Sequence, residues 1–463
     1  MLNARAYTYR ADGHVTALDD TLRGLQRFDL DAGGRVTQVT ATNWTESYAY
    51  DIAGNQTSAT WSAHLCGGAA RGDRVHTGTQ LLRAGANTYT YDALGRLVRR
   101  RKAPPSKKAE IWSYSYNADD QLTAVTTPDG TQWRYRYDPL GRRSAKERIT
   151  TDGTGSTEQT TFTWDGSVLA EQTTSDPEHL PHQVTLTWDH HGLTPLSQTE
   201  RLTEEATKRE IDSRFFAIAT DLIGTPTELV SESGDIAWHT RSTLWGDTTW
   251  NADATTYTPL RFPGQYYDPE TGFHYNHHRY YDPQTARYTT PDPLGLAPAP
   301  NPATYVHNPL TWADPLGLTP YPPKGEHSNP FGHRADAERA AFEAAGVPYG
   351  ETPVAEWTVT GDKSLKHVPG YTYSGDASHW GNFRQFETDQ GSRVVVEHTH
   401  DPAGQHFHAG KPKIDDSREL VNFGWDNGRV QRSDGSLGYP EDMERYGKIN
   451  KPGGDHHFFY SGN

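Results

Sequence analysis

Two short phrases in this chain of 463 residues carry carboxylates in a setting that suits chemistry. Each phrase reads DPLGL, and Asp292 opens the first while Asp314 opens the second. The proline after each Asp fixes φ at about −65°, and Gly295 or Gly317 allows a sharp reversal, so each phrase predicts a rigid corner that presents its carboxylate. Two carboxylates held close together can share a proton, one acting as general base toward water and one as general acid toward a peptide. A structural alternative is that both Asp side chains only cap local turns.

A second group of chemically capable residues is rich in histidine. Its sequence is RVVVEHTHDPAGQHFHAGKPK. Imidazole is the side chain whose ordinary pKa lies nearest to neutral pH, so paired histidines can supply both an acid and a base. The candidate catalytic residues of this stretch are His398, His400, His406, His408 and Lys411.

A hairpin would bring these histidines together. Asp401–Gly404 has the preferred residues of a type I turn, which predicts a three-residue hairpin loop with a bulge. In that register His400 lies opposite His406, and His398 lies opposite His408. Because side chains alternate along a strand, all four imidazoles would then share one face with two of the preceding valines. A two-residue turn is the alternative, and it would send the two pairs to opposite faces.

Two chemistries fit such a histidine face. In the first, which we favour, a histidine pair and Lys411 cleave RNA through the ribose 2′-hydroxyl without a metal, so no cofactor is expected. In the second, several histidines ligate a divalent metal in a hydrolytic nuclease or phosphodiesterase site. The terminal GGDHHFFY adds His456 and His457 to the candidate catalytic residues. Residues that could complete a metal site are Glu397, Asp401, Asp455, His456 and His457.

Composition excludes some classes of site and partner. Cys66 is the only cysteine, so the chain can form no internal disulfide and no cysteine-based zinc site. The formal net charge of −15 argues against a polyanion-binding surface spread over the whole molecule, while a local nucleic-acid site remains compatible with it. No apolar run approaches the roughly 18 residues of a membrane span, and no leader follows Met1. We therefore expect no membrane segment, and export that depends on a region outside this chain.

Repeated phrases predict the elements that position these residues. Their frame is aromatic-x-aromatic-Asp-x-x-Gly-Arg, and copies follow one another at about 20 to 25 residues, with one longer gap that we interpret as a degenerate copy. The two aromatics share one face of a strand, and Asp-x-x-Gly supplies a tight turn. Each copy therefore predicts a strand, a turn and a return strand. The copies are YTYRADGHV from Tyr7, FDLDAGGRV from Phe28, YAYDIAGNQ from Tyr48, YTYDALGRL from Tyr89, YSYNADDQL from Tyr114 and YRYDPLGRR from Tyr135.

These copies resemble the YD repeats of Rhs and teneurin-like proteins. The later segment LRFPGQYYDPETGFHYNHHRYYDPQTARYTTPDPLGL resembles the core end of the Rhs repeat-associated family. The resemblance implies a β-cocoon around a C-terminal cargo. Since the chain begins inside a repeat, we expect the tail of a larger shell or an open curved sheet. The expected fold is mainly β: a coiled antiparallel YD-repeat sheet, forming a partial Rhs cocoon, followed by a small α+β C-terminal toxin domain.

Four segments are expected along the chain. They are the YD-repeat shell over 1–258, the core-end segment over 259–318, a linker over 319–335 and the α+β domain over 336–463. The linker is rich in Pro and Gly. After it, RADAERAAFEAAG predicts a helix that begins near Asp336 and stops at Gly346, and strand-like runs follow.

The resemblance also implies a function. In the Rhs family the segment that matches the DPLGL phrases performs an aspartyl-protease-like self-cleavage, which assigns Asp292 and Asp314 as the dyad and Leu318–Thr319 as the bond that is cut. Rhs proteins with variable C-terminal domains are interbacterial toxins, secreted or delivered into target cells. The implied partners are a cognate immunity protein, a nucleic acid substrate, here RNA, and secretion machinery or an N-terminal carrier region outside this chain; the toxin would act in the target cytoplasm.

Other interpretations remain open. The last domain fits no catalytic family by its motifs, and the chain lacks both the HxE and PCxxC signature of zinc deaminases and a glycine-rich phosphate loop. An ADP-ribosyltransferase toxin is one alternative, and a non-enzymatic cell-surface YD-repeat binding protein is another. The phrase HHRYYDP over His277–Pro283 looks catalytic by itself, but its place in the core-end segment favours a packing role.

Overall fold

The computed structural model describes most of the chain up to Leu318 and shorter stretches beyond it. The chain divides into two compact units, residues 1–323 and 324–463, which are considered separately. No helix in the described part has the length and apolarity that a membrane crossing requires. The described residues are 3–10, 13–62, 66–103, 108–177, 180, 182–204, 206–318, 320, 334–365, 368, 370–375, 377, 380–388, 391–400, 405–412, 430–431, 437–438, 446–448 and 458–459.

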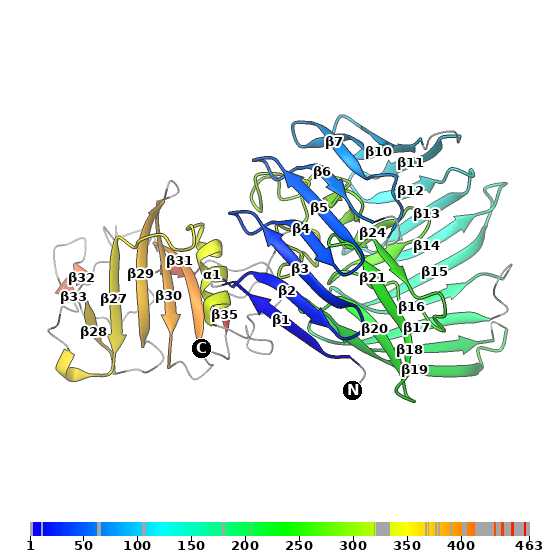
Figure 1. The fold of residues 1–463 in the computed structure, drawn as a ribbon. Helices are drawn as coiled ribbons and strands as arrows, with labels where there is room; N and C mark the ends of the chain where they lie inside the picture. Colours follow the sequence, from blue (N-terminus) through cyan, green and yellow to red (C-terminus); the bar gives the residue numbers. More distant parts are fainter. Residues whose placement is uncertain are drawn as a thin grey trace. The chain divides into compact units, whose positions relative to one another are not determined.

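A meandering sheet of 22 strands forms most of the first unit. Each strand pairs antiparallel with the one before it in the chain, and Figure 1 shows the strands following one another around a curve, from blue through cyan to green. This is the coiled antiparallel sheet that the repeats predict. Its strands are β1 Arg5–Tyr9, β2 Val15–Asp20, β3 Gly24–Leu30, β4 Val36–Ala41, β5 Thr45–Tyr50, β6 Gln56–Thr60, β7 Gly72–Thr77, β8 Gln80–Ala84, β9 Asn87–Tyr91, β10 Leu97–Lys102, β11 Glu110–Tyr116, β12 Leu122–Thr126, β13 Gln132–Tyr137, β14 Arg143–Ile149, β15 Ser156–Asp165, β16 Val168–Ser175, β17 Gln183–His191, β18 Thr194–Thr203, β19 Glu210–Thr220, β20 Pro226–Ser231, β21 Ile236–Ser242 and β22 Thr248–Trp250.

In the repeats that keep the full frame, Asp, Gly and Arg together build the turn. Asp138 accepts a hydrogen bond from the backbone N–H of Arg142 at 2.9 Å, and its other oxygen pairs with the Arg142 guanidinium at 2.7 Å. Gly141 has a φ of 81°, which glycine adopts without strain. Arg142 also donates to the carbonyl of Gly166 at 2.7 Å, so the turn is tied to a later loop of the sheet. The same Asp–Arg pairing recurs at Asp31 and at Asp92.

The aromatic residues of the frame connect one repeat to the next. The hydroxyl of the second aromatic donates a hydrogen bond to a carbonyl just after the preceding turn. Tyr137 donates to the carbonyl of Leu122 at 2.8 Å, and Tyr116 donates to the carbonyl of Leu97 at 2.9 Å. The first aromatic is buried against the core, so both belong to one face, as expected. The longer gap between copies contains the β7–β8 hairpin, which is the degenerate unit. The buried first aromatics are Phe28, Tyr48, Tyr89, Tyr114 and Tyr135.

The core-end segment folds as a second, four-stranded sheet whose residues are almost all buried. Its aromatic side chains pack against those of the large sheet in one common core. Asp268 of this sheet is fully buried and accepts from Arg143 at 2.5 Å and from Lys146 at 3.1 Å, both on β14. The segment is therefore anchored to the large sheet by both apolar packing and buried charge. Its strands are β23 Tyr266–Asp268, β24 Phe273–Asn276, β25 Arg279–Asp282 and β26 Arg287–Tyr288.

The second unit is a mixed sheet with one helix against it. Helix α1, Arg334–Ala345, ends at Gly346, whose φ is 67°, as the sequence predicts. Its apolar side packs on one face of the sheet against Val395 and Phe407. The sheet order is β28-β27-β29-β30-β31-β34, with β35 also paired to β31. The elements are β27 Ala355–Thr360, the 3-10 turn Lys363–Leu365, β28 Tyr371–Tyr373, β29 Gly381–Thr388, β30 Gly391–His398, β31 His406–Pro412, β34 Tyr446–Lys448 and β35 Phe458–Phe459, with β32 Val430–Gln431 and β33 Leu437–Gly438 forming a separate pair.

Substitutions of two neighbouring arginines test whether buried charge anchors the core-end segment. Arg143→Met leaves Asp268 buried with one cation fewer, and we expect it to lower the free energy of unfolding by about 3 to 5 kcal/mol. Arg142→Met is the matched control, since it removes a surface ion pair with Asp138 and should cost less than about 1 kcal/mol. Urea denaturation followed by tryptophan fluorescence measures both. Equal losses in the two variants would contradict the anchoring role.

Candidate functional site

The two DPLGL carboxylates converge on one arginine. Arg279 of β25 places its Nη2 atom 2.7 Å from Asp292 Oδ2 and 3.3 Å from Asp314 Oδ2. All three side chains are almost completely shielded from solvent. The structure thus brings together the two residues that the sequence proposes as a dyad, and it adds a guanidinium between them.

The same arginine and Asp314 hold the peptide that joins Gly317 to Leu318. Arg279 donates from Nε to the carbonyl of Gly317, and the N–H of Leu318 donates to Asp314 Oδ1 at 2.9 Å. Tyr288 donates its hydroxyl to Asp314 Oδ2 at 2.7 Å. This peptide directly precedes the bond proposed to be cut; Thr319, on the far side of that bond, lies outside the described residues.

The two carboxyl groups also cap local turns, as the structural alternative for the DPLGL phrases predicts. Asp292 Oδ1 accepts from the N–H of Leu294 at 2.8 Å, so it caps its own turn just as Asp314 Oδ1 caps the turn at Leu318. In each residue one oxygen caps the turn and the other faces Arg279. Turn capping and a shared carboxylate site are therefore compatible in this structure.

Burial raises the pKa of the Asp292 carboxyl, and the charge of Arg279 opposes that rise. Nearby Asp314 raises it further. A carboxyl with a raised pKa holds its proton to higher pH, which suits the acid of an acid–base pair.

The two phrases differ in their surroundings. Gly295 and Gly317 both have positive φ values, of 68° and 67°. A Cβ at Gly317 would lie 2.5 Å from the carbonyl oxygen of Asn276, whereas a Cβ at Gly295 would meet no atom within 4 Å. The first phrase is partly exposed at Leu296, while the second is packed into the core-end sheet. Only the second corner is thus held from all sides.

Arg279 has contacts beyond the packing role that the sequence predicts for its segment. It lies in HHRYYDP, which the sequence assigned to packing, and its guanidinium does lie over the Tyr288 ring at 3.6 Å. Its contacts with both aspartates add an electrostatic role. An arginine inside an otherwise aromatic, buried strand is itself a signal, because a buried cation requires carboxylate partners.

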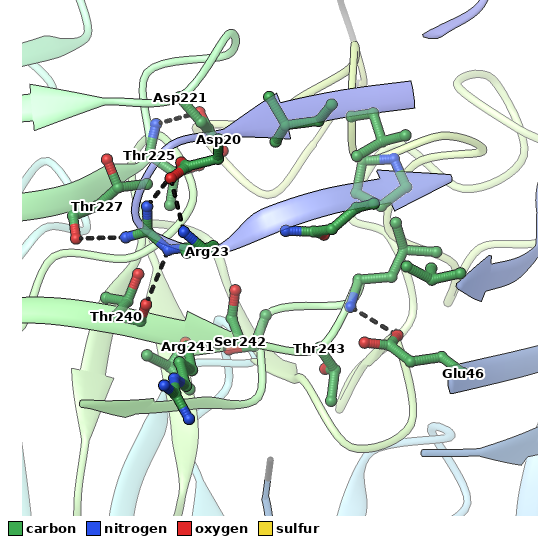
Figure 2. Close-up of a pocket in the computed structure, with 18 of the residues that line it drawn as sticks. Asp20, Arg23, Glu46, Asp221, Thr225, Thr227, Thr240, Arg241, Ser242 and Thr243 are labelled. Carbon is green, nitrogen blue, oxygen red and sulfur yellow. Dashed lines mark hydrogen bonds and ion pairs between the residues drawn. The ribbon is translucent and has the colours of Figure 1, made fainter. Parts of the chain in front are cut away.

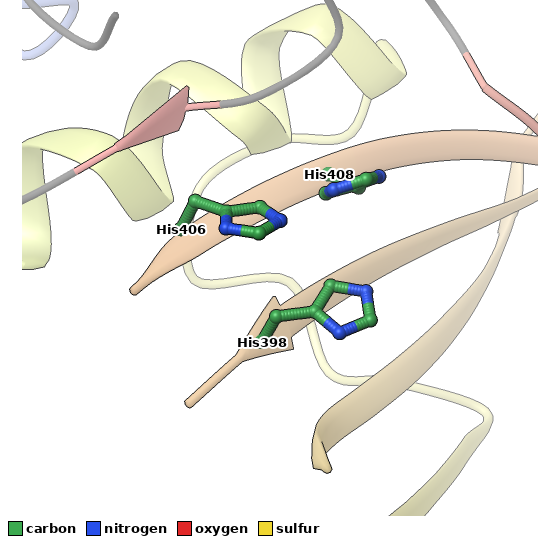
Figure 3. Close-up of side chains that lie close together, drawn as sticks. All are labelled: His398, His406 and His408. Atoms are coloured by element: carbon green, nitrogen blue, oxygen red, sulfur yellow. The ribbon is translucent and has the colours of Figure 1, made fainter. Parts of the chain in front are cut away.

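Three histidines of the second unit lie together. His398 ends β30, and His406 and His408 lie on β31; their ring centroids are 4.7 to 5.1 Å apart. Figure 3 shows the three rings side by side on one face of the two strands. His406 and His408 are only 1% and 2% exposed, and His398 is 9% exposed. They share their face with Val394 and Val396, as expected.

The predicted hairpin register is wrong by two residues. His398 pairs with His406, and Val396 pairs with His408. Pairing between β30 and β31 begins at His398 and His406, so the connection between the two strands is longer than the three-residue loop that the sequence predicts. Thr399 continues the pairing with the other neighbour of β30, because its N–H donates to the carbonyl of Trp380, next to β29, at 3.0 Å. His400 is consequently exposed, packs beside Trp380, and does not join the other three histidines.

The other proposed partners of the histidines are separated from them or lie outside the described residues. Glu397 faces α1 on the opposite side of the sheet and forms a bidentate pair with Arg334, at 2.5 and 2.6 Å, so it cannot complete a site with the histidines. Lys411 belongs to β31, where its backbone pairs with Gly447 of β34. The described part does not include Asp401, Asp455, His456 and His457.

A pocket in the first unit lies where the early strands meet β20 and β21 (Figure 2). Its charged groups engage one another: Asp20 accepts from Arg5 and Arg23 at 2.8 and 2.9 Å, and both arginines also contact Glu228. Arg23 donates to backbone carbonyls of the later strands as well. These contacts assign the charged wall of the pocket a structural role, which is to join the first strands to the later ones.

Comparison with known proteins identifies the origin of this architecture. The RHS Repeat model matches residues 116–157 and the Teneurin YD-shell model matches residues 205–303. The first unit of this chain is an Rhs-type YD-repeat region. This confirms the resemblance that the repeated phrases and the core-end segment indicated.

Two curated Rhs relatives illustrate the similarity. The probable deoxyribonuclease RhsA of Dickeya dadantii (strain 3937) is 30% identical over 319 residues, which cover 66% of this chain and 20% of the relative. The double-stranded DNA deaminase toxin A of Burkholderia cenocepacia (strain H111) is 32% identical over 333 residues, covering 66% and 22%. This chain therefore spans about a fifth of the length of these relatives.

Among solved structures, a crystal structure of TcdB2-TccC3 aligns over 68% of this chain and 19% of its own, with 19% identity and a TM-score of 0.43. The strands of this chain and their pairing define its fold.

Glu46, which lines the pocket, makes the shell sensitive to pH. Burial raises the pKa of its carboxyl from 4.5 to about 7, against hydrogen bonds from Tyr48 and from the N–H of Leu244. The folded state therefore holds this proton more tightly than the unfolded state. The resulting stability is present below about pH 4.5 and is lost as the pH rises through about 7, a change of about 3 kcal/mol. Urea midpoints at pH 5 and pH 8 measure it.

The control compares how much the free energy of unfolding changes between pH 5 and pH 8 in each variant; this change is the slope. Between these two pH values, Glu46→Gln should lose less stability than the wild type. Asp247, whose pKa burial also raises to about 7, contributes to the slope of both proteins and cancels in the comparison. Glu232→Gln, in an exposed turn, should keep the wild-type slope. An unchanged slope in Glu46→Gln would show that Glu46 does not titrate in this range.

Proposed function

We propose that this chain is the C-terminal part of an Rhs-type interbacterial toxin that cuts itself after Leu318 and releases a nucleic-acid-cleaving domain. The observation that carries the proposal is the convergence of Asp292 and Asp314 on Arg279, beside the Gly317–Leu318 peptide. A turn that served only as a turn would need neither a shared buried cation nor the second copy of the phrase.

The cleavage step follows from the properties of the two carboxyl groups. Asp314, which already touches the backbone at Leu318, acts as the base and takes a proton from water. The hydroxide attacks the carbonyl carbon of Leu318. Asp292, whose pKa burial raises, acts as the acid and gives its proton to the nitrogen of Thr319 as the C–N bond breaks. The products are a carboxyl group at Leu318 and a free amine at Thr319.

Arg279 positions this site. Its contact with the Gly317 carbonyl fixes the peptide before the cut, and its contacts with both aspartates keep the two carboxyl groups on one nitrogen. Without this cation, the charge of Asp314 would lose its ion-pair partner, and the two side chains would lose the contact that they share.

The released domain is proposed to act on nucleic acid through its histidines. RNA is the substrate that histidine acid–base chemistry favours, and DNA is the substrate named for the two relatives. Burial of His406 and His408 specifically supports a second candidate, metal-dependent hydrolysis, because buried rings cannot lie directly against a phosphodiester while they can ligate a metal.

The toxin role implies partners and a place of action. A producing cell must block the released domain, so we propose a cognate immunity protein that covers it. Delivery would depend on secretion machinery or on a carrier region outside this chain, and the toxin would act in the cytoplasm of the target cell.

Intact mass of the purified chain tests the self-cleavage. The wild type should separate into two fragments that meet between Leu318 and Thr319, while Asp292→Asn and Asp314→Asn should each remain uncut. Because the acid must carry its proton, cleavage should slow as the pH rises through the raised pKa of Asp292. Arg279→Met should also slow cleavage by misplacing the carboxyl groups.

Asp138→Asn is the control for these variants, because it alters an Asp in a surface turn of the repeat region. It should cut as the wild type does. Normal cleavage of Asp314→Asn would show that the DPLGL phrase has only a structural role.

Expression of the whole chain in bacteria tests the toxin. We expect growth arrest by the wild type, relief by His406→Ala, and no relief by His400→Ala, since His400 lies outside the histidine cluster. Incubation of the purified protein with total RNA and with double-stranded DNA, each with and without a chelator, identifies the substrate and the need for metal. A harmless wild-type chain would favour the alternative of a non-enzymatic binding protein.

A further inference from the structure

We propose that His398, His406 and His408 form a binding site for one divalent transition-metal ion, with zinc as the best fit. One ring nitrogen of each residue lies within 4.8 Å of those of the other two. This is the one such group of potential metal ligands found within the described residues. The site deepens the metal-dependent candidate of the proposed function and rests on it for any catalytic role, while metal binding itself is measured without nucleic acid, so the two can fail separately.

The backbone fixes the positions of all three ligands. His398 and His406 are direct partners in the antiparallel ladder between β30 and β31, and His408 lies two residues farther along β31, on the same face. Directly opposed residues on two strands have their Cβ atoms about 5 Å apart, so their side chains converge over the same spot. Figure 3 shows the third ring beside the first two. Three ligands on two paired strands form a rigid platform.

Ligand chemistry selects the ion. The group consists of three imidazoles with no carboxylate among them. Calcium and magnesium prefer oxygen ligands, whereas imidazole suits zinc and its neighbours in the first transition series. Zinc binds imidazole nitrogen at about 2.0–2.1 Å, so nitrogens around one tetrahedral ion lie about 3.3 Å apart. Rings whose nitrogens are within 4.8 Å reach that spacing by small rotations about χ2, a torsion that is soft in histidine.

Three protein ligands leave one position of a tetrahedral ion for water or for an oxygen of a ligand. That is the arrangement of hydrolytic zinc sites, in contrast to structural sites with four protein ligands. His398 is the most exposed of the three and marks the side from which solvent reaches the group. Glu397, the nearest carboxylate in sequence, is committed to Arg334 on the other face.

The competing explanation is that the rings are packing residues. The His398 ring does contact Phe383, at a centroid distance of 6.1 Å, and Val394 and Val396 share the same face. An apolar face is normally completed by apolar side chains, whereas three neighbouring imidazoles are the ligand set that a transition-metal ion prefers. Metal binding by the purified protein separates the two explanations.

A cobalt titration tests the site. The purified, untagged full chain, cleaved or uncut, is stripped of metal with a chelator and titrated with Co²⁺, whose visible absorption reports nitrogen ligands at a tetrahedral or five-coordinate ion. We expect absorption to saturate at one equivalent and to disappear when Zn²⁺ is added. Zn²⁺ alone should also raise the thermal midpoint, because it binds only the folded state.

Variants assign the signal to these residues. His406→Ala should weaken Co²⁺ binding by more than about 100-fold, since loss of a direct ligand exceeds the 10–100-fold cost of losing its supporting partners. His400→Ala, the matched control two residues from His398, should bind as the wild type does. His398→Ala provides a second ligand variant on the other strand in case His406→Ala does not fold. A folded wild-type chain without the absorption, or equal binding by the wild type and a folded ligand variant, would overturn the proposal.

Discussion

The concave face of a coiled sheet imposes the constraint on which the first unit depends. Each repeat directs an aromatic residue toward that face, and twenty-two strands of antiparallel sheet expose far more aromatic surface there than water tolerates. The core-end segment covers it with a small sheet of its own. Asp268 then joins the two sheets through Arg143 and Lys146, so the segment has a defined position as well as a buried one.

The candidate self-cleavage site inherits its geometry from this arrangement. Arg279 is a strand residue of the core-end sheet, and its neighbours in that sheet are fixed by the surrounding core. The second DPLGL corner packs against the same strands at Gly317. A rigid, water-poor setting strengthens each interaction between Arg279 and the two carboxylates. The segment that completes the core is thereby also the segment that positions the site.

The second unit is a sheet that a helix covers on one face. Alternation along β30 directs Val395 and Glu397 toward α1 and directs Val396 and His398 to the other face. The histidines are therefore separated from Glu397 by the thickness of the sheet. Within the part of this unit that the structure describes, the group of potential metal ligands consists of imidazoles alone.

The sequence by itself determined the periodic features. The Asp-x-x-Gly-Arg frame specifies its own turn through contacts within five residues, the aromatic pairs specify the buried face, and Gly346 specifies the end of α1. Tertiary structure decided what depends on distant partners. Arg279 became a bridge between Asp292 and Asp314 because the fold brought strand and corners together. His400 lies outside the histidine group because pairing between β30 and β31 begins at His398 and His406. Local phrases carry the information for local hydrogen bonds, whereas register and convergence are set by competition among residues far apart in the chain.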